Sequence, residues 1–199
     1  MDNKYLKKNE ILKKTIGIMH QKGFNGTGVQ EVVQAAGIPK GSFYNYFDSK
    51  EDYAIQALQF FFSGIKENSL KILKDGGIEP AERIKTFYAN NIKAFENNNF
   101  KFGCLIGNLT EEMGDISNNI AKNTEDIHQE IADAICLCLD EISNKDDKVA
   151  SINNMMLANF IVNSWQGAML RMKSSKNSEP LKAFYSVISE LLSNQKEEK

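Results

Sequence analysis

The 199-residue sequence has little cysteine, proline or histidine: three, three and two residues. An odd, low cysteine count argues against a disulfide framework, and two histidines are too few for a histidine-based zinc or catalytic cluster. With so few prolines and no sustained apolar–polar alternation, a sheet protein is not expected. No apolar run is long enough to cross a membrane, and the N-terminus MDNKYLKKNE lacks a signal-peptide core. We therefore expect a cytoplasmic, all-α protein without metal or cofactor and without membrane contact.

The net charge of −2 is unevenly distributed. Residues 1–52 carry eight lysines and six acidic residues, a net charge of +2, so the remainder carries −4. The N-terminal part is therefore the better partner for a polyanion, and Lys4, Lys7 and Lys8 are placed to reach phosphates. The asymmetry is modest and would not identify a function without the motif that follows.

The stretch from Gly23 to Tyr53 predicts two short helices joined by a turn. Thr27 and Gln30 have the spacing of a capping box, which would start the first helix. Its apolar face has helical spacing: Val29, Val32, Val33 and Ala36. Gly37 would supply the left-handed residue that ends this helix, and Pro39 would preset the start of the next.

The second helix is expected to bury one side and expose the other. Phe43 and Phe47 would point into the core. The other side would carry small, basic, phenolic and amide groups: Lys40, Gly41, Tyr44 and Asn45. Two short helices with such an outer face have the shape that enters a DNA major groove.

This segment resembles the DNA-binding domain of TetR-type transcriptional repressors. About ten positions match in order and spacing: Thr27, Val29, Ala36, Gly37, Ile38, Gly41, Tyr44, Tyr46, Phe47 and Lys50. The resemblance implies that double-stranded operator DNA is the partner. It also implies groove-facing residues, which are Lys40, Gly41, Tyr44 and Asn45, and phosphate contacts. The phosphate contacts would be Thr27, Ser42, Tyr46 and Lys50.

The rest of the chain predicts one helix after another. They cover residues 7–22, 49–74, 80–97, 104–113, 117–142 and 148–173, with a last helix from Pro180. Together with the helix pair they make the nine helices that the resemblance implies. We therefore expect a helix-turn-helix DNA-binding domain over residues 1–48. A larger helical effector-binding and dimerisation domain would cover residues 49–199.

The last helix carries a sustained apolar stripe: Leu181, Phe184, Tyr185, Ile188, Leu191 and Leu192. In an arbitrary protein such a stripe would face the chain's own core. TetR-like proteins pair their last two helices with those of a second subunit, which implies a homodimer through residues of about 150–195. A two-fold dimer requires an inverted-repeat operator.

The segment around Cys104 is the candidate effector site. A thiol at a helix N-terminus is favoured as thiolate, the reactive form. The Gly103-Cys104-Leu105 element resembles the NemR-like branch of the family, whose members sense electrophiles and oxidants through such a cysteine. Four further residues are expected around the thiol: Phe102, Trp165, Met169 and Lys173. Modification would then shift the helix over residues 104–113 against the helix that begins near Ser49.

Two alternatives remain open. The same DNA-binding dimer could hold a reversible aromatic or apolar ligand, with Cys104 a small buried apolar residue. A helical enzyme or scaffold is remote, because Glu111, Glu112 and Asp115 have no accompanying base or nucleophile and suit a solvated face. Cys136 and Cys138 point about 200° apart on a helix and cannot share a metal. His20 and His128 are interpreted as surface residues.

Overall fold

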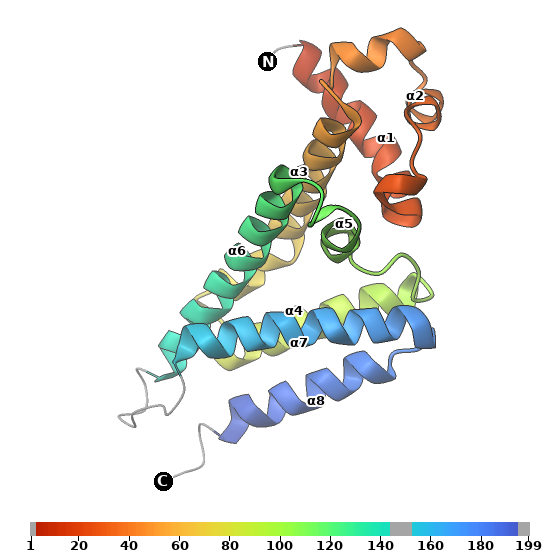
Figure 1. Ribbon diagram of the computed structural model, residues 1–199. Coiled ribbons are helices and arrows are strands. Elements are labelled where there is room, and N and C mark those ends of the chain that lie inside the picture. The colour runs from red at the N-terminus through yellow and green to blue at the C-terminus, as the bar shows by residue number, and fades with distance from the viewer. Residues whose placement is uncertain (1–2, 144–152, 195–199) are drawn as a thin grey trace. The chain divides into compact units, whose positions relative to one another are not determined.

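The computed structural model describes residues 3–143 and 153–194, and every regular element within these ranges is helical (Figure 1). The chain divides into two compact units. Unit 1 comprises Met1–Gly64 and Cys104–Glu125, and unit 2 comprises Ile65–Gly103 and Asp126–Lys199. This division cuts across the boundary predicted after residue 48, because the start of the next helix packs into the core of the N-terminal part.

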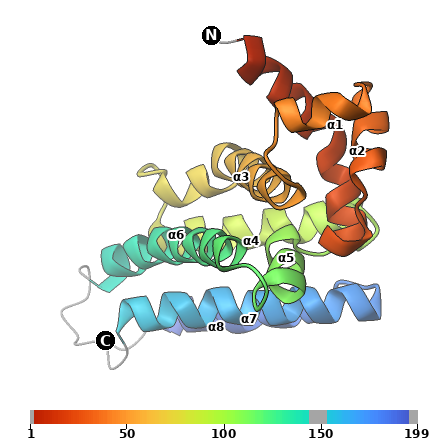
Figure 2. The same ribbon diagram turned by 45° about the horizontal axis from the view of Figure 1, so that its top comes forward.

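Unit 1 begins with α1 (Asn3–Gly26) and α2 (Val29–Ala36). They are followed by a short 3₁₀ helix, η1 (Lys40–Asn45), and by α3 (Lys50–Asn68), which contributes residues as far as Gly64. Helix α5 (Leu105–Met113) and the first part of α6 (Asn118–Ser143) complete the unit. In both ribbon views α5 lies beside the C-terminal end of α1 (Figures 1 and 2).

Unit 2 contains the 3₁₀ helix η2 (Leu70–Lys74), α4 (Pro80–Asn97) and the rest of α6. It continues with α7 (Asn154–Ser175) and α8 (Glu179–Asn194). Helix α8 packs against both α4 and α7, and Figure 1 shows α8 running next to α7. None of the helices in the described ranges is long and apolar enough to cross a membrane.

Eight α-helices and η1 account for the nine expected helices within the described residues, which confirms the all-α fold. The helix predicted over residues 49–74 is interrupted, since α3 ends at Asn68 and η2 follows. Ser49 caps α3 as expected, because its hydroxyl accepts the Asp52 backbone N–H at 3.0 Å. The expected helix start at residues 148–152 and the polar break before it fall largely outside the described residues.

The core of unit 1 joins three elements through aromatic rings. The centroids of Phe43 and Phe47 are 5.2 Å apart, and those of Phe47 and Tyr53 are 5.1 Å apart. All three residues are 0% exposed. The Tyr53 hydroxyl donates to Thr15 Oγ1 on α1 at 2.8 Å, and burial raises the pKa of Tyr53 to about 12. Tyr53 therefore remains a neutral donor at physiological pH.

A buried guanidinium group links α4 to α6 in unit 2. Arg83 on α4 is 4% exposed and donates from Nε to the Ile78 carbonyl at 2.7 Å. Its Nη1 pairs with Glu141 on α6 at 2.8 Å. A buried guanidinium requires such partners, since an unpaired charge in this position would be strongly destabilising.

The stripe on α8 has a different role from the one predicted. Four of its six residues are buried within unit 2: Leu181, Phe184, Ile188 and Leu192. They face α4 and α7, so this apolar side of α8 is covered within its own chain. The outward apolar residues of α8 are Val187 and Leu191, at 56% and 43% exposed. Of these two outward residues, only Leu191 belongs to the predicted stripe.

Candidate DNA-binding and effector sites

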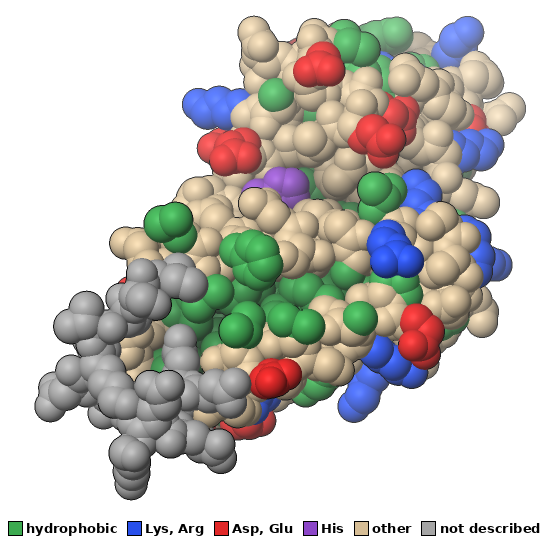
Figure 3. Space-filling model, turned by 60° about the horizontal axis from the view of Figure 1, so that its bottom comes forward, with side chains coloured by type: hydrophobic (Ala, Val, Ile, Leu, Met, Phe, Trp, Pro, Cys, Tyr) green, Lys and Arg blue, Asp and Glu red, His purple; other side chains and the backbone are tan. Residues whose placement is uncertain are grey.

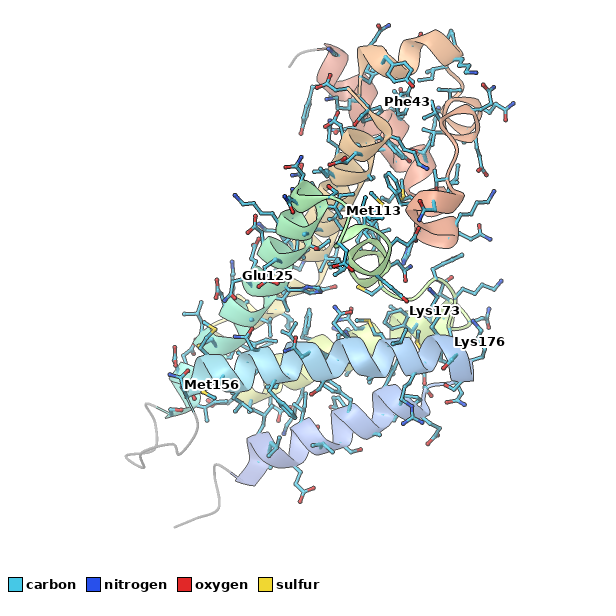
Figure 4. The ribbon with its side chains drawn as sticks, viewed as in Figure 1. Phe43, Met113, Glu125, Met156, Lys173 and Lys176 are labelled. Carbon is cyan, nitrogen blue, oxygen red and sulfur yellow. The ribbon has the colours of Figure 1, made fainter. Side chains whose placement is uncertain are left out.

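The segment η1 exposes the groups that the sequence predicted for DNA contact. Phe43, labelled in Figure 4, points into the interior of unit 1 and is fully buried. The opposite side is exposed and consists of Lys40, Gly41, Tyr44 and Asn45, with Tyr44 63% exposed. The segment is a tight 3₁₀ helix, because the Ser42 N–H donates to Pro39 O at 2.9 Å and the Tyr46 N–H to Phe43 O at 3.0 Å.

A hollow of about 680 Å³ opens on this surface. It is lined by polar residues from the start of α1 and from the end of η1: Lys4, Lys7, Tyr44, Asn45 and Tyr46. Hydrogen bonding to Glu10 at 2.8 Å raises the pKa of the Lys7 ammonium, so that side chain is cationic at neutral pH. Ammonium, phenol and amide groups around one concave surface are suited to phosphate oxygens and base edges. In the sequence, only the positive charge of Lys4 and Lys7 indicated that they would contact phosphates.

Thr27 differs from its predicted role. The capping box is wrong, because Gly28 is the N-cap of α2 and no side chain caps it. Thr27 is 1% exposed, and its hydroxyl donates to the Gly23 carbonyl at 2.7 Å. The bend of the chain at Gly23 brings that carbonyl within reach, so the hydroxyl stabilises the α1–α2 turn. Its side chain is therefore inaccessible to a DNA phosphate in this conformation.

The other expected phosphate contacts lie at the edge of the exposed face. Ser42, Tyr46 and Lys50 are each half-buried. The Lys50 ammonium lies 4.4 Å from the centroid of the Phe24 ring, a cation–π contact that holds it against the end of α1. Gly37 adopts the expected left-handed conformation, with φ of 71°, and ends α2.

A hydrogen bond that the sequence did not suggest links α5 to the turn between α1 and α2. The Asn25 backbone N–H donates to Glu112 Oε2 at 2.8 Å. Gly23 has φ of 72° and ψ of −175°, a conformation that is essentially limited to glycine. A Cβ at this position would lie 1.8 Å from Glu112 Oε1. Glu112, interpreted from the sequence as solvated, is therefore half-buried against the turn that leads into α2.

Cys104 occupies the N-cap position of α5 and is half-buried. The residues before it have unusual backbone angles: φ is 51° at Asn99, 56° at Phe100, 72° at Phe102 and 69° at Gly103. Non-glycine residues with positive φ cost about 1–3 kcal/mol each and cluster at functional sites. The thiol thus follows a strained segment, and that segment contains the expected site residue Phe102.

The remaining residues of the expected effector site lie in unit 2. Trp165 and Met169 on α7 are 8% and 5% exposed, whereas Lys173 on the same helix is exposed. Phe102 belongs to unit 2 and Cys104 to unit 1. The grouping of these five residues into one site stays a prediction.

The other two cysteines are held in environments that disfavour a thiolate. Burial raises the pKa of Cys138, whose thiol donates to Leu73 O at 3.1 Å. Burial and the Asp140 carboxylate raise the pKa of Cys136. Across residues 3–143 and 153–194, no group of three His, Cys, Asp or Glu side chains is arranged to hold a metal ion.

The two histidines are less exposed than the sequence suggested. The His20 ring packs edge-on against Phe61 with centroids 5.3 Å apart, and His128 Nε2 lies 3.0 Å from Gln166 Nε2. Both residues are half-buried, so the interpretation as surface residues is only partly correct.

Comparison with known proteins identifies the family. Residues 11–55 match the description "Bacterial regulatory proteins, tetR family", and residues 80–186 match "Transcriptional regulator LmrA/YxaF-like, C-terminal domain". The HTH-type transcriptional repressor DhaR of Mycobacterium sp. (strain GP1) is 33% identical over 185 residues, covering 93% of this chain and 91% of DhaR. The chain belongs to the TetR family and is a DNA-binding transcriptional repressor, not an enzyme.

NemR is another relative. NemR of Escherichia coli (strain K12) is 27% identical over 161 residues, which cover 81% of each chain. The crystal structure of the reduced form of E. coli NemR superposes with a TM-score of 0.83 at 25% identity, covering 92% of this chain and 94% of that one. Regulatory protein TetR from Rhodobacter sphaeroides has a TM-score of 0.82 at 25% identity, covering 91% and 96%.

The Gly23 conformation gives a test of the α5 contact. Gly23→Ala should lower the free energy of unfolding by about 1–3 kcal/mol, because alanine is strained at this φ and its Cβ meets Glu112. Gly17→Ala is the matched control, since Gly17 lies within α1 with nothing within 4 Å of an added Cβ. That substitution should stabilise the protein by about 0.5–1 kcal/mol. Urea denaturation measures both, and equal effects of the two substitutions would contradict the contact.

Proposed function

We propose that two copies of this chain bind an inverted-repeat operator and release it when a small molecule or a reactive electrophile or oxidant acts near Cys104. The observation that carries the DNA-binding part is the outward face of η1, held by the buried Phe43 and Phe47. Base-facing roles are proposed for Lys40, Gly41, Tyr44 and Asn45. Phosphate contacts are proposed for Ser42, Tyr46 and Lys50, together with Lys4 and Lys7 from the hollow beside them.

Asn45 and Lys50 should affect DNA binding in different ways. Asn45 can donate and accept together, as adenine readout requires, so Asn45→Ala should cost about 1–3 kcal/mol on the operator and relax specificity at one position per half-site. Lys50→Ala should weaken binding to all sequences and reduce the salt slope by about 1. Fluorescence anisotropy at several salt concentrations, on operator and scrambled DNA, measures both. If Asn45→Ala weakened both DNAs equally, the base-reading role would be wrong.

A dimer is supported by an unpartnered apolar face on α7 and α8. Three large residues recur on one side of α7 and are strongly exposed: Met156 at 68%, Phe160 at 58% and Leu170 at 62%. Val187 and Leu191 add to this surface from α8. Hydrophobic side chains gather on the lower half of the face drawn in Figure 3. An exposed apolar patch of this kind is typical of a protein interface, and symmetry would place the same patch on both copies.

Phe160→Glu should separate the dimer, because a carboxylate would then be buried in an apolar interface. The dissociation constant should rise by a factor of at least roughly 30, corresponding to about 2 kcal/mol. Leu137→Glu is the matched control, since Leu137 is also strongly exposed, at 57%, but belongs to α6 and not to α7 or α8. Sedimentation velocity should find Phe160→Glu monomeric and Leu137→Glu dimeric. A Phe160→Glu protein that remained dimeric would exclude this face as the interface.

The effector response is proposed to begin at Cys104. Cys104 lies at the N-cap of α5, directly after the segment with positive φ values. Burial raises the pKa of Cys136 and of Cys138, which disfavours the thiolate at both positions. The solved structure of the relative NemR is described as its reduced form. Cys104 and Glu112 lie at opposite ends of α5, and Glu112 accepts a hydrogen bond from the backbone beside the α1–α2 turn. A displacement of α5 would therefore reach the helix-turn-helix through Glu112 and Asn25, rather than through α3 as expected from the sequence.

Cys104→Ser should abolish operator release by a mild oxidant and by a maleimide. In the parent protein, added bulk at position 104 should lower operator affinity by roughly a hundredfold, corresponding to about 3 kcal/mol of coupling. Cys136→Ser is the matched control and should respond as the parent does. Electrophoretic mobility shift with intact-mass analysis measures release and modification together. Release of DNA by the Cys104→Ser protein would instead favour a reversible, non-covalent aromatic or apolar ligand.

A further inference from the structure

Tyr88, on α4, has a buried hydroxyl without a hydrogen-bond partner. The residue is 1% exposed, and its Oη contacts no donor or acceptor among the described residues. Ser189 Oγ is the other such atom within those ranges. A serine hydroxyl can turn toward its own helix backbone, whereas a phenol oxygen is held away from the backbone by a rigid ring. The Tyr88 hydroxyl therefore requires a partner from outside its own helix.

Aromatic rings from three helices of unit 2 surround this phenol. The centroid of the Tyr88 ring lies 4.8 Å from that of Phe184 on α8 and 5.0 Å from that of Trp165 on α7. The rings of Trp165 and Phe184 are themselves 5.1 Å apart. These distances are typical of favourable ring packing, and ring faces of this kind accept flat, apolar groups.

One ring of this cluster is packed less closely than the others. The Phe95 ring centroid lies 6.4 Å from that of Trp165, and Phe95 is half-buried whereas Tyr88, Trp165 and Phe184 are buried. Phe95 is near the C-terminal end of α4, two turns beyond Tyr88. Phe95 is therefore the ring of this cluster that reaches the protein surface.

The chemistry of the cluster limits what could bind. Burial raises the pKa of Tyr88 well above its ordinary value, so its hydroxyl stays a neutral donor. The rings that pack against Tyr88 are those of Phe87, Trp165 and Phe184, and these rings offer an apolar surface to a ligand. A carboxylate would therefore lose its hydration without compensation, whereas an uncharged carbonyl oxygen could accept the phenol proton at a much smaller desolvation cost.

We propose that the Tyr88 hydroxyl is the polar anchor of a binding site for a small, uncharged carbonyl compound with an aromatic or unsaturated body. Trp165 and Phe184 would pack against that body, and Phe95 would move to admit it. This proposal rests on the proposed response to a small molecule and specifies its ligand class. The site is independent of Cys104 chemistry, so a carbonyl compound that does not react with thiols should also occupy it.

Acetophenone and ethylbenzene form a suitable pair of probes, because they differ by a carbonyl oxygen on otherwise similar frames. Isothermal titration calorimetry of the full-length parent protein should give tighter binding of acetophenone. Tyr88→Phe should weaken acetophenone binding by about 3- to 10-fold, as the loss of one hydrogen bond predicts, and leave ethylbenzene binding unchanged. Tyr185→Phe, at a half-buried position on α8, is the matched control and should change neither affinity. Benzoate should bind more weakly than acetophenone.

Failure to bind either neutral probe, or equal weakening of both probes in Tyr88→Phe, would overturn the proposal. A second measurement does not depend on the ligand. Without a probe, Tyr88→Phe should raise the midpoint of thermal unfolding, because it removes an unpaired buried hydroxyl; a lower midpoint would mean that the hydroxyl already has a permanent partner. Operator binding by Tyr88→Phe without a probe should match the parent. Loss of operator binding by the parent itself would contradict the proposed function and not this site.

Discussion

The aromatic packing of Phe43, Phe47 and Tyr53 is the constraint on which the proposed DNA-binding surface depends. A six-residue 3₁₀ segment has too few hydrogen bonds to be stable alone, so η1 takes its conformation from the rings beneath it. Tyr53 brings α3 into the same cluster and hydrogen bonds to Thr15 on α1. With one side of η1 fixed inward in this way, its polar side can only face solvent. The position of Asn45 is therefore a consequence of core packing.

The same unit that carries η1 also carries Cys104, through α5. Glu112 occupies the space that a side chain at residue 23 would need, and its carboxylate accepts a backbone N–H from the α1–α2 turn. A helix fastened at this point cannot shift without disturbing that turn. The strained backbone before Cys104 lies at the other end of α5, where a small chemical change would act on a segment that already stores conformational energy. The hydrogen bond between Glu112 and Asn25 gives the proposed response a physical route within unit 1, from Cys104 along α5 to the α1–α2 turn.

Much of this architecture could be predicted from the sequence, because local signals and long-range packing agree there. The Gly37 cap, the Ser49 cap and the inward rings of Phe43 and Phe47 follow from short-range rules. The prediction that Thr27 caps α2 is wrong because the chain bends at Gly23. The Gly23 carbonyl then accepts the Thr27 hydroxyl, and capping preferences do not contain this information. The α8 stripe was assigned to a partner because periodicity detects an apolar face and not what covers it.

Two other contacts that the sequence did not suggest join residues far apart in the chain. Glu112 and Asn25 are separated by 87 residues, and nothing near either residue marks them as partners. Tyr88 is similar, since its ring neighbours come from α7 and α8, and no local pattern distinguishes a tyrosine with a satisfied hydroxyl from one without. Pairings of this kind follow from the packing of whole helices.

Footprinting with dimethyl sulfate, which methylates guanine N7 in the major groove and adenine N3 in the minor groove, tests the central claim most directly on the DNA upstream of the gene that encodes this chain. The claim is that the face of η1 fixed by the aromatic core reads DNA, once in each copy of a symmetric dimer. The account predicts two protected half-sites in inverted orientation, with the recognition segments in major grooves about one helical turn, roughly 34 Å, apart. Protection of a single unrepeated site, or protection confined to the minor groove, would contradict it.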